Sequence, residues 1–446
     1  MIDPSTLTIA SAARALRQRQ LTSRTLTDAC LARIEAQDGA LNAFITITPT
    51  LAREQADRAD RELADGFDRG PLHGIPLSIK DLIDIDGFPT TAASRVRDGL
   101  IARRDAPIIS ALRRAGAVFV GKTNLHEFAL GTTGEESAYG PTCHPLDDTR
   151  SPGGSSSGSA ASLLAGMCLA SIGTDTGGSI RMPSAACGLV GLKPTIDEVS
   201  ADGVVPLSRA FDCIGPLAKT TDDAWAVYDV LIGRTPASLI TPRPIEAPRR
   251  VGLVGGYFAS PLADPVAEAY ADVVHAVRET DVRVDDVTLS EASLAPSIYV
   301  VMVIGEAAAL HARTLERVPD AYTRGIRLRL EMGRYILGED VVRAERARRR
   351  LRAQVDAALS THDVLVMPTM PIVAPLLGAS TVRVGESDVP VRSAMLRNTQ
   401  PFNITGHPAL TLPAPSPGLP VGVQIVGKRT DAVLRAGRWL ERVLGR

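Results

Sequence analysis

The sequence predicts an α/β protein in which layers of helices cover both faces of a large mixed, twisted β-sheet. Short apolar runs bounded by turn residues, the pattern of buried strands, alternate with stretches of helical spacing. The 446 residues can bury a large core, and no internal repeat or linker separates independent units. We therefore expect one domain over residues 1–446.

The N-terminal part, residues 1–65, is expected to be helical. Apolar side chains recur there at the spacing of one helix face in three stretches, which begin near Thr8, Leu26 and Leu51. From residue 70 onward the apolar runs become shorter, which indicates that the sheet begins there.

The remaining elements follow the same patterns. A helical segment rich in Arg covers about 297–359, an amphipathic helix over 431–444 closes the chain, and the Pro-rich stretch 235–248 is expected to be a surface connection. The strand candidates are 75–82, 117–120, 251–254, 284–289 and 363–367.

Composition and charge exclude several classes of protein. Lys and Arg total 49 against 50 Asp and Glu, a balance that gives no attraction to nucleic acid or to an anionic membrane. The five cysteines are an odd number without a C-x-x-C pair, which argues against a disulfide framework and a zinc ribbon. We see no signal peptide and no membrane-spanning run, so we expect a cytoplasmic protein.

Two glycine-rich turns carry the chemistry. The first, 151–159, leads directly into a good helix former, and the second contains Gly177 and Gly178 before Ser179. Successive glycines before a serine let consecutive backbone N–H groups face one point, which is the geometry of an oxyanion hole. A serine in either turn is therefore a candidate nucleophile.

Longer motifs extend this pattern over nearly the whole chain, with 300–355 as the exception. They are Pro71-Leu-His-Gly-Ile-Pro-Leu-Ser-Ile-Lys-Asp, Gly121-Lys-Thr-Asn-Leu-His-Glu-Phe-Ala, Gly140-Pro-Thr-Cys-His-Pro, Gly153-Gly-Ser-Ser-Ser-Gly-Ser, Gly173-Thr-Asp-Thr-Gly-Gly-Ser-Ile-Arg-Met-Pro, Asp212-Cys-Ile-Gly-Pro and Pro420-Val-Gly-Val-Gln-Ile-Val-Gly. In this order they resemble the amidase signature family of serine hydrolases. The resemblance implies a single amidase signature domain with its signature core at about 70–220.

The resemblance also implies the catalytic roles. Ser179 would be the nucleophile, and Ser155, typically in a cis peptide, would relay its proton to Lys80. Ser157 departs from the family, where many members have glycine. The family further suggests that Asp175 and Arg181 form a structural ion pair that braces the nucleophile loop.

Elementary chemistry agrees with these roles. A serine hydroxyl needs a base, and a lysine can be that base only when burial keeps it neutral. Lys80 lies in an apolar run, Ile79-Lys-Asp-Leu-Ile, whose alternation should turn Asp81 away from it. The oxyanion would be held by the backbone N–H groups of Thr176, Gly177, Gly178 and Ser179.

The predicted reaction is hydrolysis of a small-molecule amide through an acyl-enzyme, without metal or organic cofactor; esters and carbamates (urethanes) could react by the same steps. Two alternatives stay open: the A subunit of a glutamine-dependent aminoacyl-tRNA amidotransferase, and an inactive binding protein on the same fold. Homodimers are common in similar proteins, so the resemblance also suggests a homodimer. Candidate pocket residues, from motif order, are Gly131, Thr132, Arg209, Phe211, Met370 and Gln400.

Several short patterns point elsewhere and are set aside. Residues 116–123 match the phosphate-binding P-loop pattern, but the strand-like run lies inside the motif rather than before it. His126-Glu begins a zinc-protease motif, but Leu130 replaces its second histidine. The arginines between Arg343 and Arg352 spread around a helix, which is typical of a solvated face and not of RNA binding.

Overall fold

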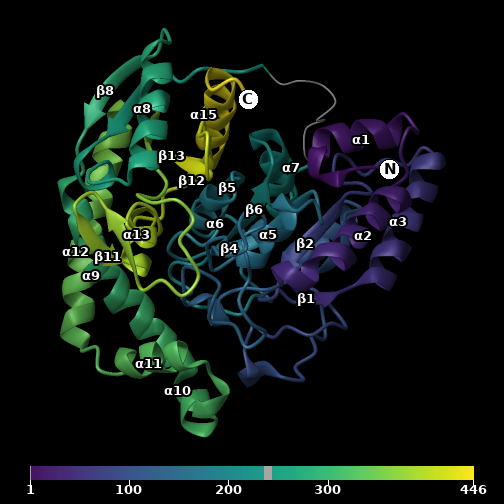
Figure 1. Cartoon of the computed structure of the whole chain (residues 1–446), viewed down its shortest axis with the longest axis horizontal. Helices are drawn as coiled ribbons and strands as arrows, with labels where there is room; N and C mark the ends of the chain where they lie inside the picture. Colours follow the sequence, from purple (N-terminus) through teal and green to yellow (C-terminus); the bar gives the residue numbers. More distant parts are fainter. Residues whose placement is uncertain (1, 236–243) are drawn as a thin grey trace.

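The computed structural model describes residues 2–235 and 244–446, so most of the connection expected at 235–248 lies outside the described residues. Its main feature is an eleven-stranded sheet in the order β1-β3-β2-β4-β6-β5-β12-β13-β9-β7-β8 (Figure 1). The strands are β1 (Phe44–Ile47), β2 (Pro76–Lys80), β3 (Val118–Thr123), β4 (Ala170–Asp175), β5 (Val190–Lys193), β6 (Cys213–Ala218), β7 (Arg250–Val254), β8 (Arg283–Val287), β9 (Val364–Pro368), β12 (Ala409–Ala414) and β13 (Val421–Gly427).

The sheet is mixed, with a parallel group at each side of an antiparallel centre. Strand β2 pairs in parallel with β3 and β4, and β7 pairs in parallel with β8 and β9. The pairs from β4 through β6, β5, β12 and β13 to β9 are antiparallel. Strands β10 (Thr381–Val384) and β11 (Ser387–Pro390) form a separate hairpin.

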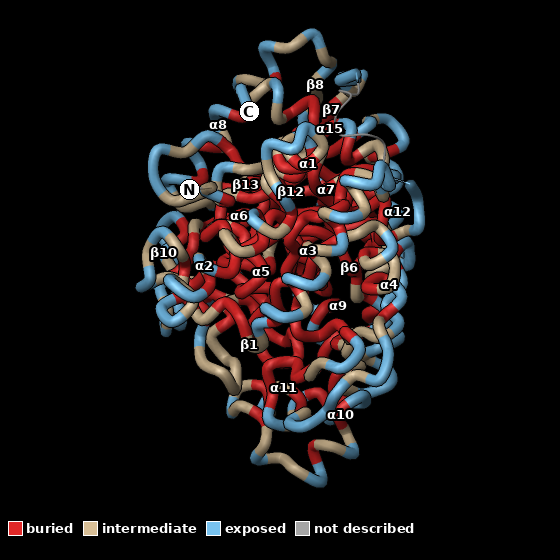
Figure 2. The backbone as a smooth tube through the Cα atoms, turned by 90° about the vertical axis from the view of Figure 1, so that its right-hand side faces the viewer, coloured by how far each residue is buried: buried red, intermediate tan, exposed pale blue. Residues whose placement is uncertain are grey.

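Helices lie on both faces of the sheet (Figure 1). Buried residues gather at the centre of the molecule, and exposed residues lie around its periphery (Figure 2). The helices are α1 (Ile9–Arg17), α2 (Ser23–Leu41), α3 (Pro49–Ala64), α4 (Pro107–Arg114), α5 (Ser157–Leu164), α6 (Arg181–Ala186), α7 (Thr221–Leu231), α8 (Asp264–Arg278), α9 (Ala295–Tyr299), α10 (Gly305–Arg317), α11 (Arg324–Gly333), α12 (Gly338–Thr361), α13 (Val391–Leu396), α14 (Gln400–Ile404) and α15 (Thr430–Val443).

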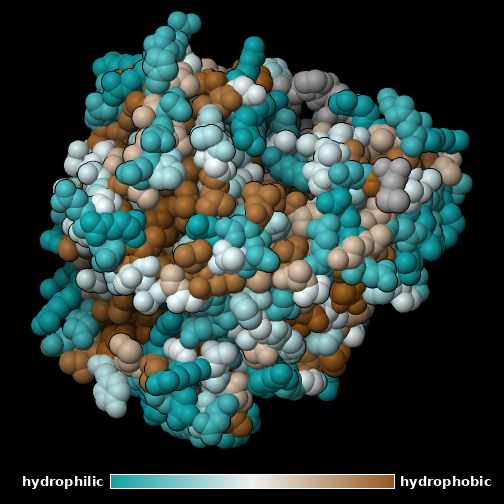
Figure 3. All heavy atoms as spheres, in the orientation of Figure 1, coloured by the Kyte–Doolittle hydropathy of each residue, from teal (hydrophilic) through white to brown (hydrophobic). Residues whose placement is uncertain are grey.

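Strand β9 shows how the sheet divides the core. Val364 and Val366 belong to a core cluster that includes residues of α1, α2, α7, α8 and α15, whereas Leu365 and Met367 belong to one with α9–α14. Successive side chains of a strand point to opposite faces, so a helical layer covers each face. The predicted fold class is confirmed. On the face shown in Figure 3, apolar side chains gather toward the middle and hydrophilic ones around the rim.

The expected elements mostly coincide with the structure. The five strand candidates are β2, β3, β7, β8 and β9, and the three N-terminal helices, the 297–359 segment and the closing helix are all helical. The prediction missed the other six strands of the main sheet, among them β4, which lies inside the glycine-rich stretch. The strand needs Gly173 there, because a Cβ at this position would lie 2.9 Å from Leu217 and 3.0 Å from Ser156 Oγ.

Among the described residues, one helical run, Ser290–Arg317, is long and apolar enough by composition to cross a membrane. The core helix of a soluble protein passes the same test, and Ile298, Val303 and Ala307 of this run are buried in the second core cluster. One such run is by itself weak evidence for a membrane segment.

Candidate active site

Lys80, the last residue of β2, is fully buried and hydrogen-bonded to three hydroxyl groups. Its Nζ lies 2.8 Å from Ser155 Oγ, 2.9 Å from Ser156 Oγ and 2.8 Å from Thr174 Oγ1. Both serines come from the turn before α5, and Thr174 comes from β4, which pairs with β2. Pairing of the two strands and docking of the turn thus surround one amine with hydroxyls.

The electrostatics of this position favour a neutral amine. Burial lowers the pKa of Lys80 to about 7, although the charges of Asp212 and Asp175 act in the opposite direction. Asp81 points away, as alternation predicts, and lies 2.7 Å from Lys122 Nζ. The carboxylates that oppose the depressed pKa are therefore Asp212 and Asp175, which no pattern in the sequence connects with Lys80.

Ser179 lies in the second glycine-rich turn, between β4 and α6, and is 4% exposed. Its carbonyl accepts a hydrogen bond from the Ser156 N–H at 3.3 Å, which joins the two turns. The Gly154–Ser155 peptide bond is cis. Within the described residues, the Ser179 hydroxyl makes no hydrogen bond. Ser155 is therefore hydrogen-bonded to Lys80 but not to Ser179.

The backbone around Gly177 and Gly178 leaves no room for larger residues. Gly178 has φ +135°, and a Cβ there would lie 2.1 Å from Thr399 Oγ1; one on Gly177 would lie 2.7 Å from Tyr299 Oη. Thr399 Oγ1 also donates to the Gly177 carbonyl at 2.6 Å. Among the described residues, the N–H groups of 176–179 donate no hydrogen bond, so they are available to an oxyanion.

Asp175 and Arg181 bracket this turn as a fully buried ion pair. One carboxylate oxygen lies 2.9 Å from Arg181 Nη2, and the other accepts from the N–H groups of Ile180 and Arg181. Burial alone would raise the pKa of Asp175, but the Arg181 charge and hydrogen bonds from Arg181 and Asn403 lower it to about 2. The pair thus fixes the start of α6 beside Ser179.

Asp212 is a neighbour of the site to which sequence analysis gave no role. One of its oxygens accepts from Thr176 Oγ1, and the other accepts from the N–H groups of Leu207 and Ser208 at 2.9 and 3.1 Å. Burial raises the pKa of Asp212 to about 6. Asp212 therefore positions an oxyanion-loop residue and places a charge near Lys80. In the sequence, Asp212 stands out only as the first residue of the motif Asp212-Cys-Ile-Gly-Pro. The spacing of residues does not predict that it contacts Thr176 or acts on Lys80.

The predicted pocket residues do not gather at one cavity. Gly131 and Thr132 line a cavity of about 260 Å³, whereas the other four do not. Arg209 is exposed, and its N–H donates to Glu306. Phe211 is buried beneath the guanidinium of Arg348. Met370 and Gln400 are each 3% exposed.

The structure agrees with two of the patterns set aside from the sequence and also argues against Cys187 as an alternative nucleophile. Lys122 of the P-loop match is buried in β3 and binds Asp81, so it cannot hold a phosphate. Burial raises the pKa of Cys187, which leaves it an unreactive thiol. Arg343, Arg349 and the other arginines of α12 mostly pair with carboxylates on their own helix.

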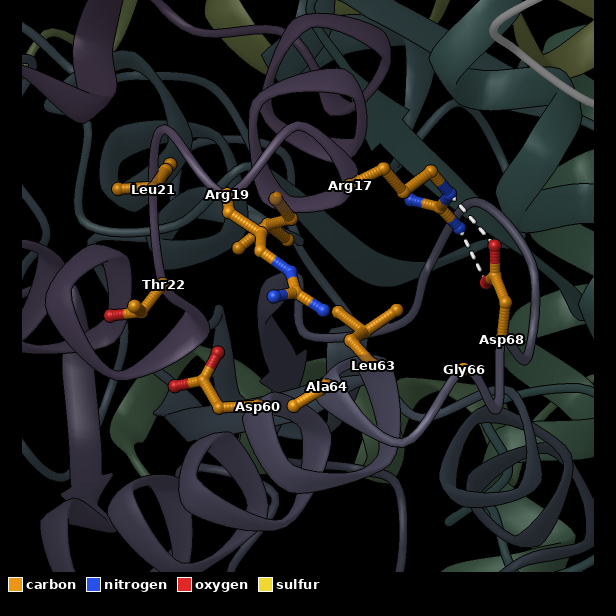
Figure 4. Close-up of a pocket in the computed structure, with 10 residues that line it drawn as sticks. Arg17, Arg19, Leu21, Thr22, Asp60, Leu63, Ala64, Gly66 and Asp68 are labelled. Atoms are coloured by element: carbon orange, nitrogen blue, oxygen red, sulfur yellow. Dashed lines mark hydrogen bonds and ion pairs between the residues drawn. The ribbon is translucent and has the colours of Figure 1, made fainter.

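A larger cavity of about 320 Å³ lies away from these residues, between α1 and α3. Figure 4 shows Arg19 extending into it between Asp60 and Leu63, and the Arg17–Asp68 ion pair at its edge. None of the predicted site residues lines it.

The amidase family model matches residues 25–433. This chain belongs to the amidase family. It is 36% identical to the A subunit of the glutamyl-tRNA(Gln) amidotransferase from Chloroflexus aurantiacus over 98% of this chain and 96% of that protein. An amidase crystal structure matches with TM-score 0.92 and 35% identity over 98% of this chain and all of that one. The crystal structure of the A subunit from Thermotoga maritima matches with TM-score 0.78 and 29% identity, over 99% of this chain and 96% of that one. As an amidase family enzyme, the chain acts on carbon–nitrogen bonds.

Proposed function

We propose that this amidase hydrolyses the C–N amide bond of a small molecule with Ser179 as nucleophile, Ser155 as proton relay and Lys80 as base. The observation that carries the proposal is the 2.8 Å contact between Lys80 Nζ and Ser155 Oγ in fully buried surroundings. Burial makes the amine a base near neutral pH, and the hydroxyl can accept one proton while donating another.

The reaction follows from these positions. Ser179 Oγ attacks the carbonyl carbon while its proton passes through Ser155 to Lys80, and the N–H groups of residues 176–179 hold the oxyanion. The C–N bond then breaks as Lys80 returns the proton, through Ser155, to the departing amine. Water attacks the remaining ester by the same relay, which releases the acid and regenerates Ser179.

The similarity to amidases indicates that the substrate bond is an amide, whereas the Ser179–Ser155–Lys80 relay by itself does not select the bond type. An ester or a carbamate carbonyl would pass through the same steps, and a urethane substrate stays within the proposal. The cytoplasmic location and the homodimer remain predictions. An inactive binding protein is the weaker alternative, because Lys80 and Ser155 are in hydrogen-bonding contact.

A second candidate is the A subunit of a glutamine-dependent aminoacyl-tRNA amidotransferase. Its support is the 36% identity to such proteins over 98% of this chain. The structural likeness favours the amidase, since the TM-score is 0.92 for the amidase structure and 0.78 for the Thermotoga maritima protein. An amidotransferase component would need partner chains for its activity, so turnover by the purified chain alone favours the amidase.

The proposal is tested with the purified chain and a panel of amides, anilides, esters and carbamates. We expect turnover by the wild type that is lost in Ser179→Ala and in Lys80→Ala. Ser110→Ala on α4 is the matched control and should keep full activity. Turnover that survives Ser179→Ala would overturn the mechanism, and a folded but wholly inactive wild type would favour the amidotransferase component.

A further inference from the structure

Two arginines from different helices converge on one backbone carbonyl. Arg329 of α11 and Arg392 of α13 each direct Nη1 at the Leu130 oxygen, at 3.3 and 3.5 Å. Both side chains line the cavity of about 260 Å³ that also contains Gly131 and Thr132. A single carbonyl cannot satisfy two guanidinium groups, so their other partners decide what the cavity binds.

The two arginines differ in their partners. Arg329 lies 2.7 Å from Glu136, which also contacts His126 at 3.1 Å. The hydrogen bond from His126, followed by the charges of His126 and Arg329, lowers the pKa of Glu136 to about 2. Arg392 has no carboxylate within ion-pair distance among the described residues, and its one hydrogen bond is the long contact to Leu130. Its guanidinium fork is therefore largely uncommitted.

The cavity adjoins the proposed catalytic turn that carries Ser155. A Cβ on Gly154, the residue before Ser155, would lie 3.0 Å from the backbone of both Thr132 and Thr133, so the cavity wall packs against this turn. A Cβ on Gly177 of the oxyanion loop would lie 2.7 Å from Tyr299 Oη, so Tyr299 packs against this loop. Burial lowers the pKa of Arg392, and the charge of Tyr299 raises it. Tyr299 therefore lies in the electrostatic surroundings of Arg392.

We propose that Arg392 binds a carboxylate of the substrate, so that the hydrolysed amide carries a negative charge at its far end. A guanidinium presents two parallel N–H donors that match the two oxygens of a carboxylate. Glu135 and Glu136 line the same cavity and disfavour a doubly charged group such as phosphate. This inference rests on the proposed amidase function and adds the chemical class of its substrate.

The experiment compares monoamides of the linear dicarboxylic acids from malonate to adipate with the corresponding diamides. Each pair differs only in a carboxylate replaced by a neutral carboxamide. In at least one pair we expect the wild type to prefer the carboxylate by about 10- to 100-fold in kcat/KM, the range for a charged hydrogen-bonded pair. Arg392→Gln should abolish the preference by raising KM for the monoamide more than for the diamide.

The matched control is Arg334→Gln, which removes the same charge from a half-exposed arginine that pairs with Glu316 outside the cavity. It should keep the preference, and Arg392→Lys should restore only part of it, because lysine lacks the planar fork. A preference that survives Arg392→Gln, or no preference at any chain length, would overturn the inference.

Binding separates this inference from the proposed reaction. Titration calorimetry with each monoamide of the series uses Ser179→Ala, alone and combined with Arg392→Gln. We expect the second change to weaken Kd by the same factor as it raises KM. If the wild type turns over neither series while binding to Ser179→Ala still depends on Arg392, the reaction is wrong and the carboxylate site stands. Binding that is indifferent to Arg392 contradicts the site.

Discussion

The Nζ atom of Lys80 lies 2.8 Å from Ser155 Oγ, although the two residues are 75 positions apart in the chain. Strand β2 delivers the lysine from inside the sheet, and the turn before α5 delivers the serine. Both are fully buried, so the amine meets hydroxyl groups rather than water. This relationship places a base in contact with a proton relay, and most of our predictions follow from it.

The base should show itself in the pH dependence. Because burial lowers the pKa of Lys80 to about 7, the neutral amine is lost as the pH falls through that value. We expect kcat/KM to fall tenfold per pH unit below about pH 7. Lys80→Arg should lose activity by a factor on the order of 10² to 10⁴, because a guanidinium stays protonated. Lys428→Arg, on the surface, should be unaffected.

Ser155 and Ser156 provide a matched pair, since both hydroxyls contact Lys80, at 2.8 and 2.9 Å. Only Ser155 is proposed to carry the proton. Ser155→Ala should lower kcat by about 100-fold or more, and Ser156→Ala should lower it much less. Steady-state kinetics on the same amide compare the two. A larger loss of kcat in Ser156→Ala would show that Ser156, and not Ser155, carries the proton.

Asp212 should tune the base. Its charge is the largest of those that raise the pKa of Lys80, so its removal in Asp212→Asn should lower that pKa further. The acid limb of the activity profile should then move to lower pH, while an asparagine oxygen can still accept from Thr176. Asp202→Asn, on the surface, should leave the limb in place. A shift to higher pH would show that the charge does not act on Lys80.

The ion pair between Asp175 and Arg181 should matter for stability. Asp175→Asn leaves a buried guanidinium without its counter-charge, a change that costs about 3–5 kcal/mol in the free energy of unfolding. Asp320→Asn breaks an exposed pair with Arg327 and should change little. Urea unfolding followed by circular dichroism measures both. Equal midpoints for the two variants would show that the buried pair contributes nothing to the fold.

The oxyanion loop should not tolerate a side chain at Gly178. A Cβ there would overlap Thr399 Oγ1, and the positive φ strains any other residue. We expect Gly178→Ala to lower kcat by about 100-fold or more, as displacement of an oxyanion donor does. Gly418→Ala is the matched control, because nothing lies within 4 Å of its Cβ. Equal activity of the two variants would mean that the loop does not bind the oxyanion.

Some of this could be predicted from the sequence. The lysine, the two serines and the strand that carries Lys80 lie in long motifs whose order defines the fold class. Strand β4 was missed because its glycine and threonine residues are typical of loops. The sequence does not show that both faces of this strand are buried. Propensity describes neighbours in the chain, and β4 exists because β2 and β6 pair with it.

The surroundings of the site were harder to predict for the same reason. Asp212 reaches Thr176 and Arg392 reaches Leu130 only after the chain has folded, across 36 and 262 positions. Of the pocket residues expected from motif order, Gly131 and Thr132 line the cavity beside the catalytic turns. Phe211 and Met370 are packed in the core instead, because an apolar side chain near a motif serves packing as readily as recognition.

The most direct measurement is the site at which a sulfonyl fluoride modifies the purified protein, read by peptide mass spectrometry across a pH series. We expect one adduct, on Ser179, whose rate of formation rises through pH 7 and which is lost in Lys80→Ala while that variant stays folded. An adduct on Cys187 or another residue, or labelling of Ser179 that does not depend on Lys80, would contradict the relay.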